Sequence, residues 1–147
     1  MSDTSQPLDL AVRALRGHDR SRSDVEERLA RAGVAPDQVA ETLATLERLG
    51  YLDDERYAHA RAEELAGRGY GDEWIRRDLR EHGVERETAA AAVEALTPEP
   101  ERAARLASGT GGAPDRRLAA RLQRKGFGAD SLEAALGGAF ADVDERA

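Results

Sequence analysis

The strongest constraint on the fold is a short pattern that occurs three times along the chain. In each copy an apolar residue is followed four positions later by Leu, four positions later by Gly, and then directly by another apolar residue. Residues four apart share one face of an α-helix, and glycine suits the left-handed position that ends a helix. The pattern therefore predicts a helix, a glycine stop and a second helix in each copy. The copies are Val25-Leu29-Gly33-Val34, Ile75-Leu79-Gly83-Val84 and Leu118-Leu122-Gly126-Phe127.

Apolar residues continue past each glycine at matching offsets, which predicts the buried face of the second helix. Ser23 with Glu26 reads as a capping box, and Pro36 suits the first turn of a helix. No stretch alternates apolar and polar residues as a strand does, so we predict an all-α fold. The matching positions are Val39, Leu43 and Leu46, then Ala89, Val93 and Leu96, then Leu132, Leu136 and Ala139.

The repeats predict an elongated, curved array of three tandem three-helix units, because each unit can bury only its own apolar face and that of its neighbour. Gly50 ends the first copy, a third helix follows it as far as residues 67–71, and another helix from Leu8 to Arg16 lies in front. The expected segments are a leading segment 1–19, repeat one 20–70, repeat two 71–107, a glycine-rich linker 108–114 and repeat three 115–147.

Composition narrows the class of protein. The chain has 147 residues, no cysteine and a formal net charge of −7, which excludes disulfide frameworks and thiolate metal sites. Residues 51–100 carry 13 acidic and 7 basic side chains, which argues against an autonomous DNA binder with a positive long-range field. No apolar run approaches the ~20 residues of a membrane span, and we expect a cytoplasmic location.

No segment carries a signature of catalysis or of metal binding. The acidic run 53–55 is better explained by helix capping than by a shared ligand, since adjacent helical residues point in different directions. The glycine-rich segment 67–71 follows a helix rather than a strand and lacks the Lys-Ser/Thr of a phosphate loop, so we interpret it as a linker. We predict no catalytic residue, no metal and no cofactor. The three histidines, which lack metal-ligand spacing, are His18, His59 and His82.

Two arginine-rich helix faces are candidates for contact with phosphate or with an acidic protein surface. Asp78 and Glu81 partly neutralise the first face, whereas Asp115 is the nearest acid to the second. Charge on a helix face often serves only to keep that face solvated. The second face is the stronger candidate because fewer acids lie near it to neutralise its charge. Trp74 is expected as a partly buried anchor between units, with a binding hot spot as the alternative. The candidates are Arg76, Arg77 and Arg80 in the first face and Arg117, Arg121, Arg124 and Lys125 in the second.

The segment Gly50–Ala58 resembles a sequence box of the RecX family, the bacterial regulators of the recombinase RecA. That box reads glycine, aromatic, aliphatic, Asp or Asn, Asp, two variable residues, aromatic and alanine. The stretch Ser21–Leu29 is similar to the family's opening, and the later repeats resemble its second and third units, so the resemblance extends from Leu8 to Phe140. The box residues, for which it implies a mostly structural role, are Gly50, Tyr51, Leu52, Asp53, Asp54, Tyr57 and Ala58.

The resemblance implies a monomeric, non-enzymatic regulator without a cofactor. Such a protein binds RecA and the RecA–single-stranded DNA filament, with at most weak direct contact to DNA. It inhibits the ATPase, strand exchange and co-protease activities that serve recombination, DNA repair and the SOS response. Two other classes stay open. Short helix–glycine–helix units also resemble helix-turn-helix modules, which bind nucleic acid without RecA. An unrecognised enzyme is the third class, although no site chemistry supports it.

The repeat alignment predicts the effect of truncating its central leucines. Leu29→Ala, Leu79→Ala and Leu122→Ala are each expected to lower the free energy of unfolding by roughly 2–5 kcal/mol, because each removes core volume. Chemical denaturation of the full chain measures this change. A loss below about 0.5 kcal/mol, the range of surface substitutions, would show that the copies are misaligned.

Overall fold

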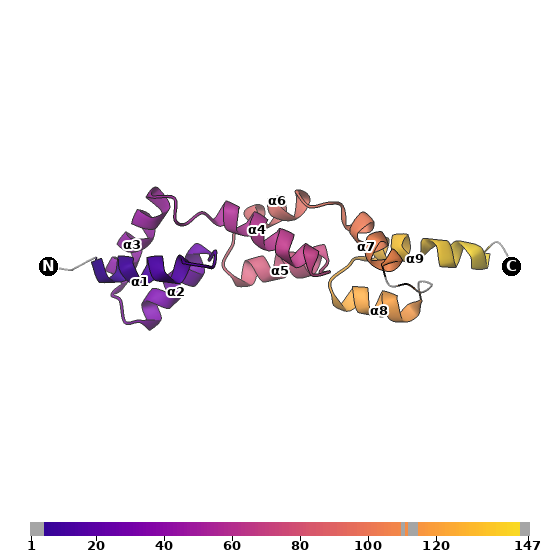
Figure 1. Cartoon of the computed structure of the whole chain (residues 1–147), viewed down its shortest axis with the longest axis horizontal. Coiled ribbons are helices and arrows are strands. Elements are labelled where there is room, and N and C mark those ends of the chain that lie inside the picture. The colour runs from indigo at the N-terminus through magenta and orange to yellow at the C-terminus, as the bar shows by residue number, and fades with distance from the viewer. Residues whose placement is uncertain (1–4, 110, 112–114, 145–147) are drawn as a thin grey trace.

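The computed structural model describes residues 5–109, 111 and 115–144, with side chains from 6 to 137 within those ranges. Throughout the described residues the regular structure is helical, as predicted, and no helix there is long and apolar enough to cross a membrane. The helices follow one another along a long axis, with the two chain termini at opposite ends (Figure 1). They are α1 (Ser5–Leu15), α2 (Arg22–Arg31), α3 (Pro36–Arg48), α4 (Asp54–Gly67), α5 (Asp72–Glu81), α6 (Arg86–Glu94), α7 (Glu99–Ser108), α8 (Arg116–Arg124) and α9 (Ala129–Asp144).

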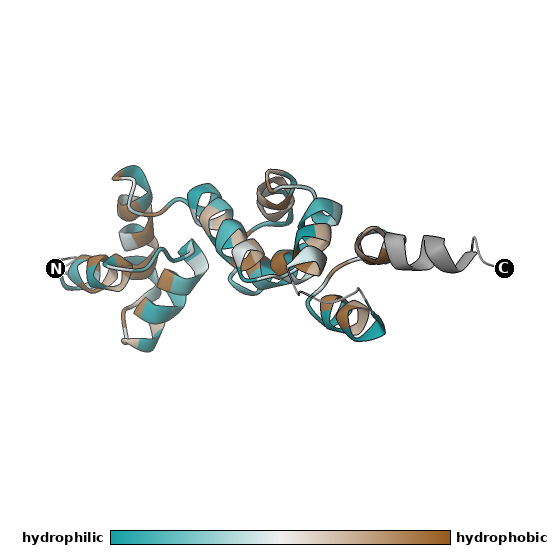
Figure 2. Cartoon of the chain, turned by 45° about the vertical axis from the view of Figure 1, so that its right-hand side comes forward, coloured by the Kyte–Doolittle hydropathy of each residue, from teal (hydrophilic) through white to brown (hydrophobic). Residues whose placement is uncertain are grey.

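Each group of three consecutive helices encloses its own hydrophobic core, which confirms the elongated three-unit array. Hydrophobic and hydrophilic residues alternate along the helices (Figure 2), and the buried hydrophobic ones gather in three separate clusters. The central leucines Leu29, Leu79 and Leu122 are all buried, one in each core. Other core members are Val25, Leu43 and Leu46 in the first unit, Ile75, Ala89 and Val93 in the second, and Leu118, Phe127 and Ala135 in the third.

The core packing divides the chain at different points from the expected segments. Helix α1 packs in the first core through Ala11, α4 in the second through Leu65, and α7 in the third through Ala103. The units therefore change before Asp54 and before Glu99. The repeated pattern marks the second and third helices of each unit and leaves its first helix unmarked, so the sequence predicted α4 within repeat one and α7 within repeat two.

Parts of the expected segments lie outside the described residues. These are residues 1–4 of the leading segment, 110 and 112–114 of the linker, and 145–147 of repeat three. The side chain of Ala139 is also outside them. The linker begins later than expected, because Ser108 still belongs to α7 and Gly109 is its C-cap.

The repeated glycines end the middle helices in the predicted left-handed conformation. Gly33, Gly83 and Gly126 have φ values of 83°, 79° and 91°. At each stop the glycine amide donates to the carbonyl three residues back, and the following amide donates to the carbonyl of the central leucine. These paired bonds form a Schellman motif, which satisfies carbonyls at the helix end and turns the chain toward the next helix.

The helix starts confirm some of the predicted caps and correct one. Asp53 is the N-cap of α4 and accepts a hydrogen bond from the Arg56 amide, and Pro36 opens α3. The predicted capping box at Ser23 is wrong, since the N-cap of α2 is Ser21, whose hydroxyl accepts from the Asp24 amide at 3.1 Å. Ser23 lies inside the helix. The cap was misplaced because Ser21 and Ser23 both suit the position, and only the backbone path distinguishes them.

The first two units join through the ends of their middle helices. The Ser21 hydroxyl at the start of α2 donates to the His82 carbonyl at the end of α5, 2.5 Å away. A Cβ added to Gly83 would lie 2.2 Å from the Cβ of Ser23. The Asp54 carboxylate, at the start of α4, accepts from the Arg22 amide at 2.8 Å. A short glycine corner thus docks directly on a helix start.

The second and third units join in the same way at corresponding positions. The Gly71 amide at the start of α5 donates to the Lys125 carbonyl at the end of α8, 2.7 Å away. A Cβ added to Gly126 would lie 2.6 Å from the Cβ of Trp74. The Asp72 amide donates to the carboxylate of Glu99, the first residue of α7, at 2.7 Å. The same kind of joint therefore occurs twice in the fold.

The joint predicts that the same substitution lowers the stability of the protein by different amounts at different glycines. Gly83→Ala and Gly126→Ala should destabilise the protein more than Gly33→Ala does. All three alanines bear the strain of a left-handed residue, about 1–2 kcal/mol, but nothing lies within 4 Å of a Cβ at Gly33. Chemical denaturation of the three variants gives the difference. Equal losses at the three positions would mean that the joints do not need the close approach.

Candidate functional site

The middle unit carries a basic groove between α5 and α6. The groove has a volume of about 610 Å³ and an alanine floor, with Glu73 and Glu81 also on its walls. Arg77 makes a long 4.0 Å ion pair with Glu73. The structure thus brings together the three arginines expected from the sequence and adds one from α6. These arginines are Arg76, Arg77, Arg80 and Arg86.

A second basic groove lies at the joint between the second and third units. It has a volume of about 410 Å³ and is lined by the end of α4, by α7 and by α8. Leu106 and Leu122 contribute apolar surface, and no acidic side chain lines the groove. We call it the joint groove. Its basic side chains are Arg68, Arg105, Arg121 and Lys125.

Lys125 is held in the joint groove by contacts with the preceding unit. Its ammonium donates to the Arg68 carbonyl at 3.3 Å and lies 5.0 Å from the centroid of the Tyr70 ring. A Cβ at Gly69 would be 3.4 Å from the same nitrogen, so glycine leaves room for it. The glycine-rich segment 67–71, interpreted from sequence as a linker, is therefore part of a joint and a groove wall.

The structure divides the second arginine-rich face. Arg121 and Lys125 line the joint groove, whereas Arg117 and Arg124 are exposed and do not line it. The sequence did not indicate three of the groove arginines, because they lie on other helices than the clustered ones. These are Arg68, Arg86 and Arg105. The only local signal was the position of Arg68 between two glycines.

A buried arginine network holds the second joint together. Arg102, 9% exposed, donates to the Asp72 carboxylate at 2.8 Å and to the Tyr70 carbonyl at 3.1 Å. Glu99 accepts from the Ser131 hydroxyl at 2.5 Å and from the Gly128 amide at 2.8 Å. Partial burial opposes the charge of Glu99, but these hydrogen bonds and Arg102 prevail and lower its pKa.

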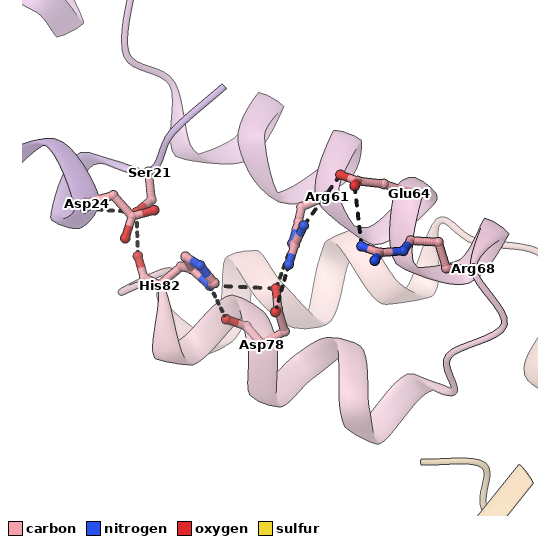
Figure 3. A network of polar contacts seen from close by, with 7 residues as sticks. All are labelled: Ser21, Asp24, Arg61, Glu64, Arg68, Asp78 and His82. Atoms are coloured by element: carbon pink, nitrogen blue, oxygen red, sulfur yellow. Dashed lines mark hydrogen bonds and ion pairs between the residues drawn. The ribbon is translucent and has the colours of Figure 1, made fainter. Parts of the chain in front are cut away.

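A polar chain runs from the first joint through the middle unit (Figure 3). The Arg61 guanidinium donates twice to the buried Asp78 carboxylate, at 2.9 and 3.0 Å. The His82 ring contacts the Asp78 carbonyl at 2.8 Å. Burial first, and then the nearby Asp24 carboxylate, raise the pKa of Tyr57 to about 12. These groups are engaged with one another and stabilise the stacking of α4 on α5.

The sequence box 50–58 lies across the change from the first unit to the second. Leu52 is buried in the first core, while Tyr57 and Ala58 are buried in the second. Gly50 has a φ of 80° and ends α3, Asp53 caps α4, and Asp54 bonds to Arg22 as described above. The Tyr51 side chain is the exception, since it is 50% exposed beside the 56% exposed Leu49.

The remaining candidates from the sequence have no catalytic surroundings. His18 and His59 are exposed, and no group of three His, Asp or Glu in the described part of the chain could hold a metal. Trp74 is partly buried, stacks on Tyr70 with ring centroids 4.0 Å apart, and contacts Gly126 of the next unit. It is an anchor between units, the first of the two alternatives. Its contacts are those of a packing residue.

Comparison with known proteins agrees with this architecture. Residues 53–93 match the family model described as RecX, second three-helix domain. The chain is 35% identical over 150 residues to the regulatory protein RecX of Halorhodospira halophila, covering 94% of this chain and 90% of that protein. It is 34% identical over 137 residues to the RecX of Xanthomonas axonopodis pv. citri, covering 88% and 85%.

A solved structure has the same fold. The crystal structure of RecX from Lactobacillus salivarius superposes with a TM-score of 0.79 and 21% identity, covering 92% of this chain and 95% of that one. The matched family segment begins at Asp53 and so agrees with the unit change that the core packing defines.

The Glu99 contacts predict a pH-dependent second joint. Because the pKa of folded Glu99 is lowered, its stabilising contribution is present above the unfolded pKa and is lost as the pH falls through the folded one. The difference in Tm between the native chain and Glu99→Gln should therefore be full at neutral pH and shrink below about pH 4. Glu101→Gln, exposed on the same helix, is the control. A difference that does not change with pH would contradict the assignment.

Proposed function

The chain belongs to the RecX family, and from that premise we propose that it binds RecA and the RecA–single-stranded DNA filament. Bound there, it lowers the ATPase, strand exchange and co-protease activities of RecA. It acts in the cytoplasm as a monomer and by binding rather than by catalysis. It needs no cofactor of its own, since the nucleotide that turns over belongs to RecA.

The observation that carries this proposal is the in-line arrangement of three separately cored units (Figure 1). A filament presents the same surface at regular intervals along a helical path. An extended array can contact successive protomers of such a filament, and linkage of the contacts adds avidity. A globule of the same size with one core would reach fewer protomers.

The distribution of charge supports contact with a mixed surface. The two basic grooves suit phosphate or acidic groups of the filament. On the first joint, a groove of about 630 Å³ is lined by five acidic residues and one arginine, and suits basic protein surface. The acidic residues are Glu26, Glu47, Asp53, Asp54 and Glu85.

The alternative is a helix-turn-helix module that binds nucleic acid without RecA. The family membership and the net charge of −7 give it less support than the regulator. Its distinguishing expectation is sequence-specific binding to duplex DNA, because such modules read base edges in the major groove.

Addition of the protein to RecA tests the proposal. Substoichiometric amounts, added during assembly or to preformed filaments on single-stranded DNA, should lower ATP hydrolysis and strand exchange, because one array opposes growth or turnover of several protomers. Filament length and pull-down with RecA are measured in parallel. The proposal fails if hydrolysis and length do not respond and no complex is recovered.

A further inference from the structure

The basic side chains of the joint groove are not required to hold the two units together. Arg102, Glu99 and the Gly71–Lys125 bond hold the two units together on their own. Among the described residues, no carboxylate forms an ion pair with Arg105, Arg121 or Lys125. Arg68 has only a long, exposed ion pair with Glu64, at 3.6 Å. Four cations thus line one concave surface, and three of them have no ion-pair partner among the described residues.

The repeat provides an internal comparison for this groove. A groove at the corresponding place on the first joint is lined by Gly17, His18, Ala60, Arg61 and His82, among others. Counted from the first residues of α4 and α7, Ala60 corresponds to Arg105 and Arg61 to Leu106. The first-joint groove also contains acidic side chains, which are Asp19, Asp24 and Glu64.

The largest difference concerns the buried ion pair of the middle unit. Asp78 and Arg121 both lie five residues before the glycine that ends their helix. In the middle unit Asp78 pairs with Arg61 across α4 and α5. In the last unit the same two positions hold Arg121 and Leu106, so the acid is replaced by an unpaired base. The two units therefore share the same helix packing, but the charge at this position is negative in the middle unit and positive in the last.

The chemistry of the groove defines its ligand. Arginine guanidinium groups bind phosphate oxygens through paired hydrogen bonds, and three arginines line this groove together with Lys125. Leu106, 36% exposed, gives the floor an apolar part on which a sugar or base can lie. A volume of about 410 Å³ accepts a phosphate with its attached sugar. The concave site suits a flexible strand better than the convex, rigid backbone of a duplex.

We propose that the joint groove binds the phosphodiester backbone of single-stranded nucleic acid directly, without RecA. The strand crosses the joint, and Arg68, Arg105, Arg121 and Lys125 contact its phosphates. Because the site is assembled from two units, a bound strand also holds those units in one orientation. This inference extends the proposed function and does not rest on it.

The net charge of −7 does not oppose such binding. Charges more than about 8 Å away are largely screened at physiological ionic strength. Two acids at the joint, Asp72 and Glu99, are already engaged by Arg102 and by backbone amides. Glu64 pairs with Arg68 at 3.6 Å, so the local field at the groove is set mainly by Arg105, Arg121 and Lys125.

The internal comparison also supplies the test variant. Arg105→Ala/Arg121→Asp gives the groove the residues that occupy the corresponding positions at the first joint. Arg13→Ala/Arg28→Asp makes the same change of charge in a basic groove of the first unit, to which no ligand is assigned, and is the matched control. Binding of a fluorescently labelled oligo(dT) to the full chain is measured by anisotropy over a series of salt concentrations, and thermal melts check that both variants fold.

The joint-groove variant should lose at least about tenfold in affinity near physiological salt. Its plot of log K against log salt should become shallower by roughly 1.4, which is two phosphates of a single strand at ~0.7 each. The control should change both quantities much less. Equal losses in the two variants would reduce the effect to general charge and overturn the proposal.

Competitors identify the source of the phosphate. Unlabelled oligo(dT) should displace the labelled strand at concentrations far below those of inorganic phosphate or of a duplex of equal length. Equal competition by inorganic phosphate would indicate a simple anion site, and equal competition by the duplex would exclude selection of a single strand. Either result overturns the proposal.

Pull-down with RecA in the absence of DNA separates this inference from the proposed function. If the native chain captures RecA but the joint-groove variant binds oligo(dT) as well as the native chain does, the groove assignment fails and the RecA proposal stands. If the native chain binds oligo(dT) through the groove but neither captures RecA nor alters its activity, the RecA proposal fails and the groove assignment stands.

Discussion

The array depends on one contact, in which the glycine corner that ends a middle helix docks on the start of the preceding middle helix. The corner offers a carbonyl that would otherwise lack a partner, and the helix start offers a polar hydrogen and space. Glycine is required for two reasons, which are the left-handed turn and the close approach to Ser23 or Trp74. Further hydrogen bonds support this contact, between Arg22 and Asp54 at the first joint and between Arg102 and Asp72 at the second.

The two joints use the same geometry with different chemistry, and this difference gives the molecule its surfaces. The first joint has a hydroxyl donor, Ser21, and an exposed hydrogen bond from the Arg22 amide to the Asp54 carboxylate. The second has a backbone donor and the buried Arg102 network. The grooves beside them differ accordingly, since acids line both grooves of the first joint and none lines the groove of the second.

Net charge is a poor guide to the ligands of such a chain. Several acids of the middle segment are engaged within the protein, with Asp54 and Glu99 accepting backbone amides and Asp72 and Asp78 accepting arginines. Arginines 105 and 121, by contrast, have no ion-pair partner among the described residues. A chain can therefore be acidic in total and still present a cationic groove.

The sequence by itself determined the helices, their glycine stops, the buried faces and the family resemblance. These follow from contacts between residues close in the chain, and the spacing of Val25, Leu29 and Gly33 is enough to define a helix and its end. The tertiary structure alone decided which helices share a core and where the units change. It also decided that Ser21 rather than Ser23 caps α2. Membership of the joint groove could not be read from sequence, because Arg68 and Arg121 are brought together only when a corner of one unit docks on the helix start of another.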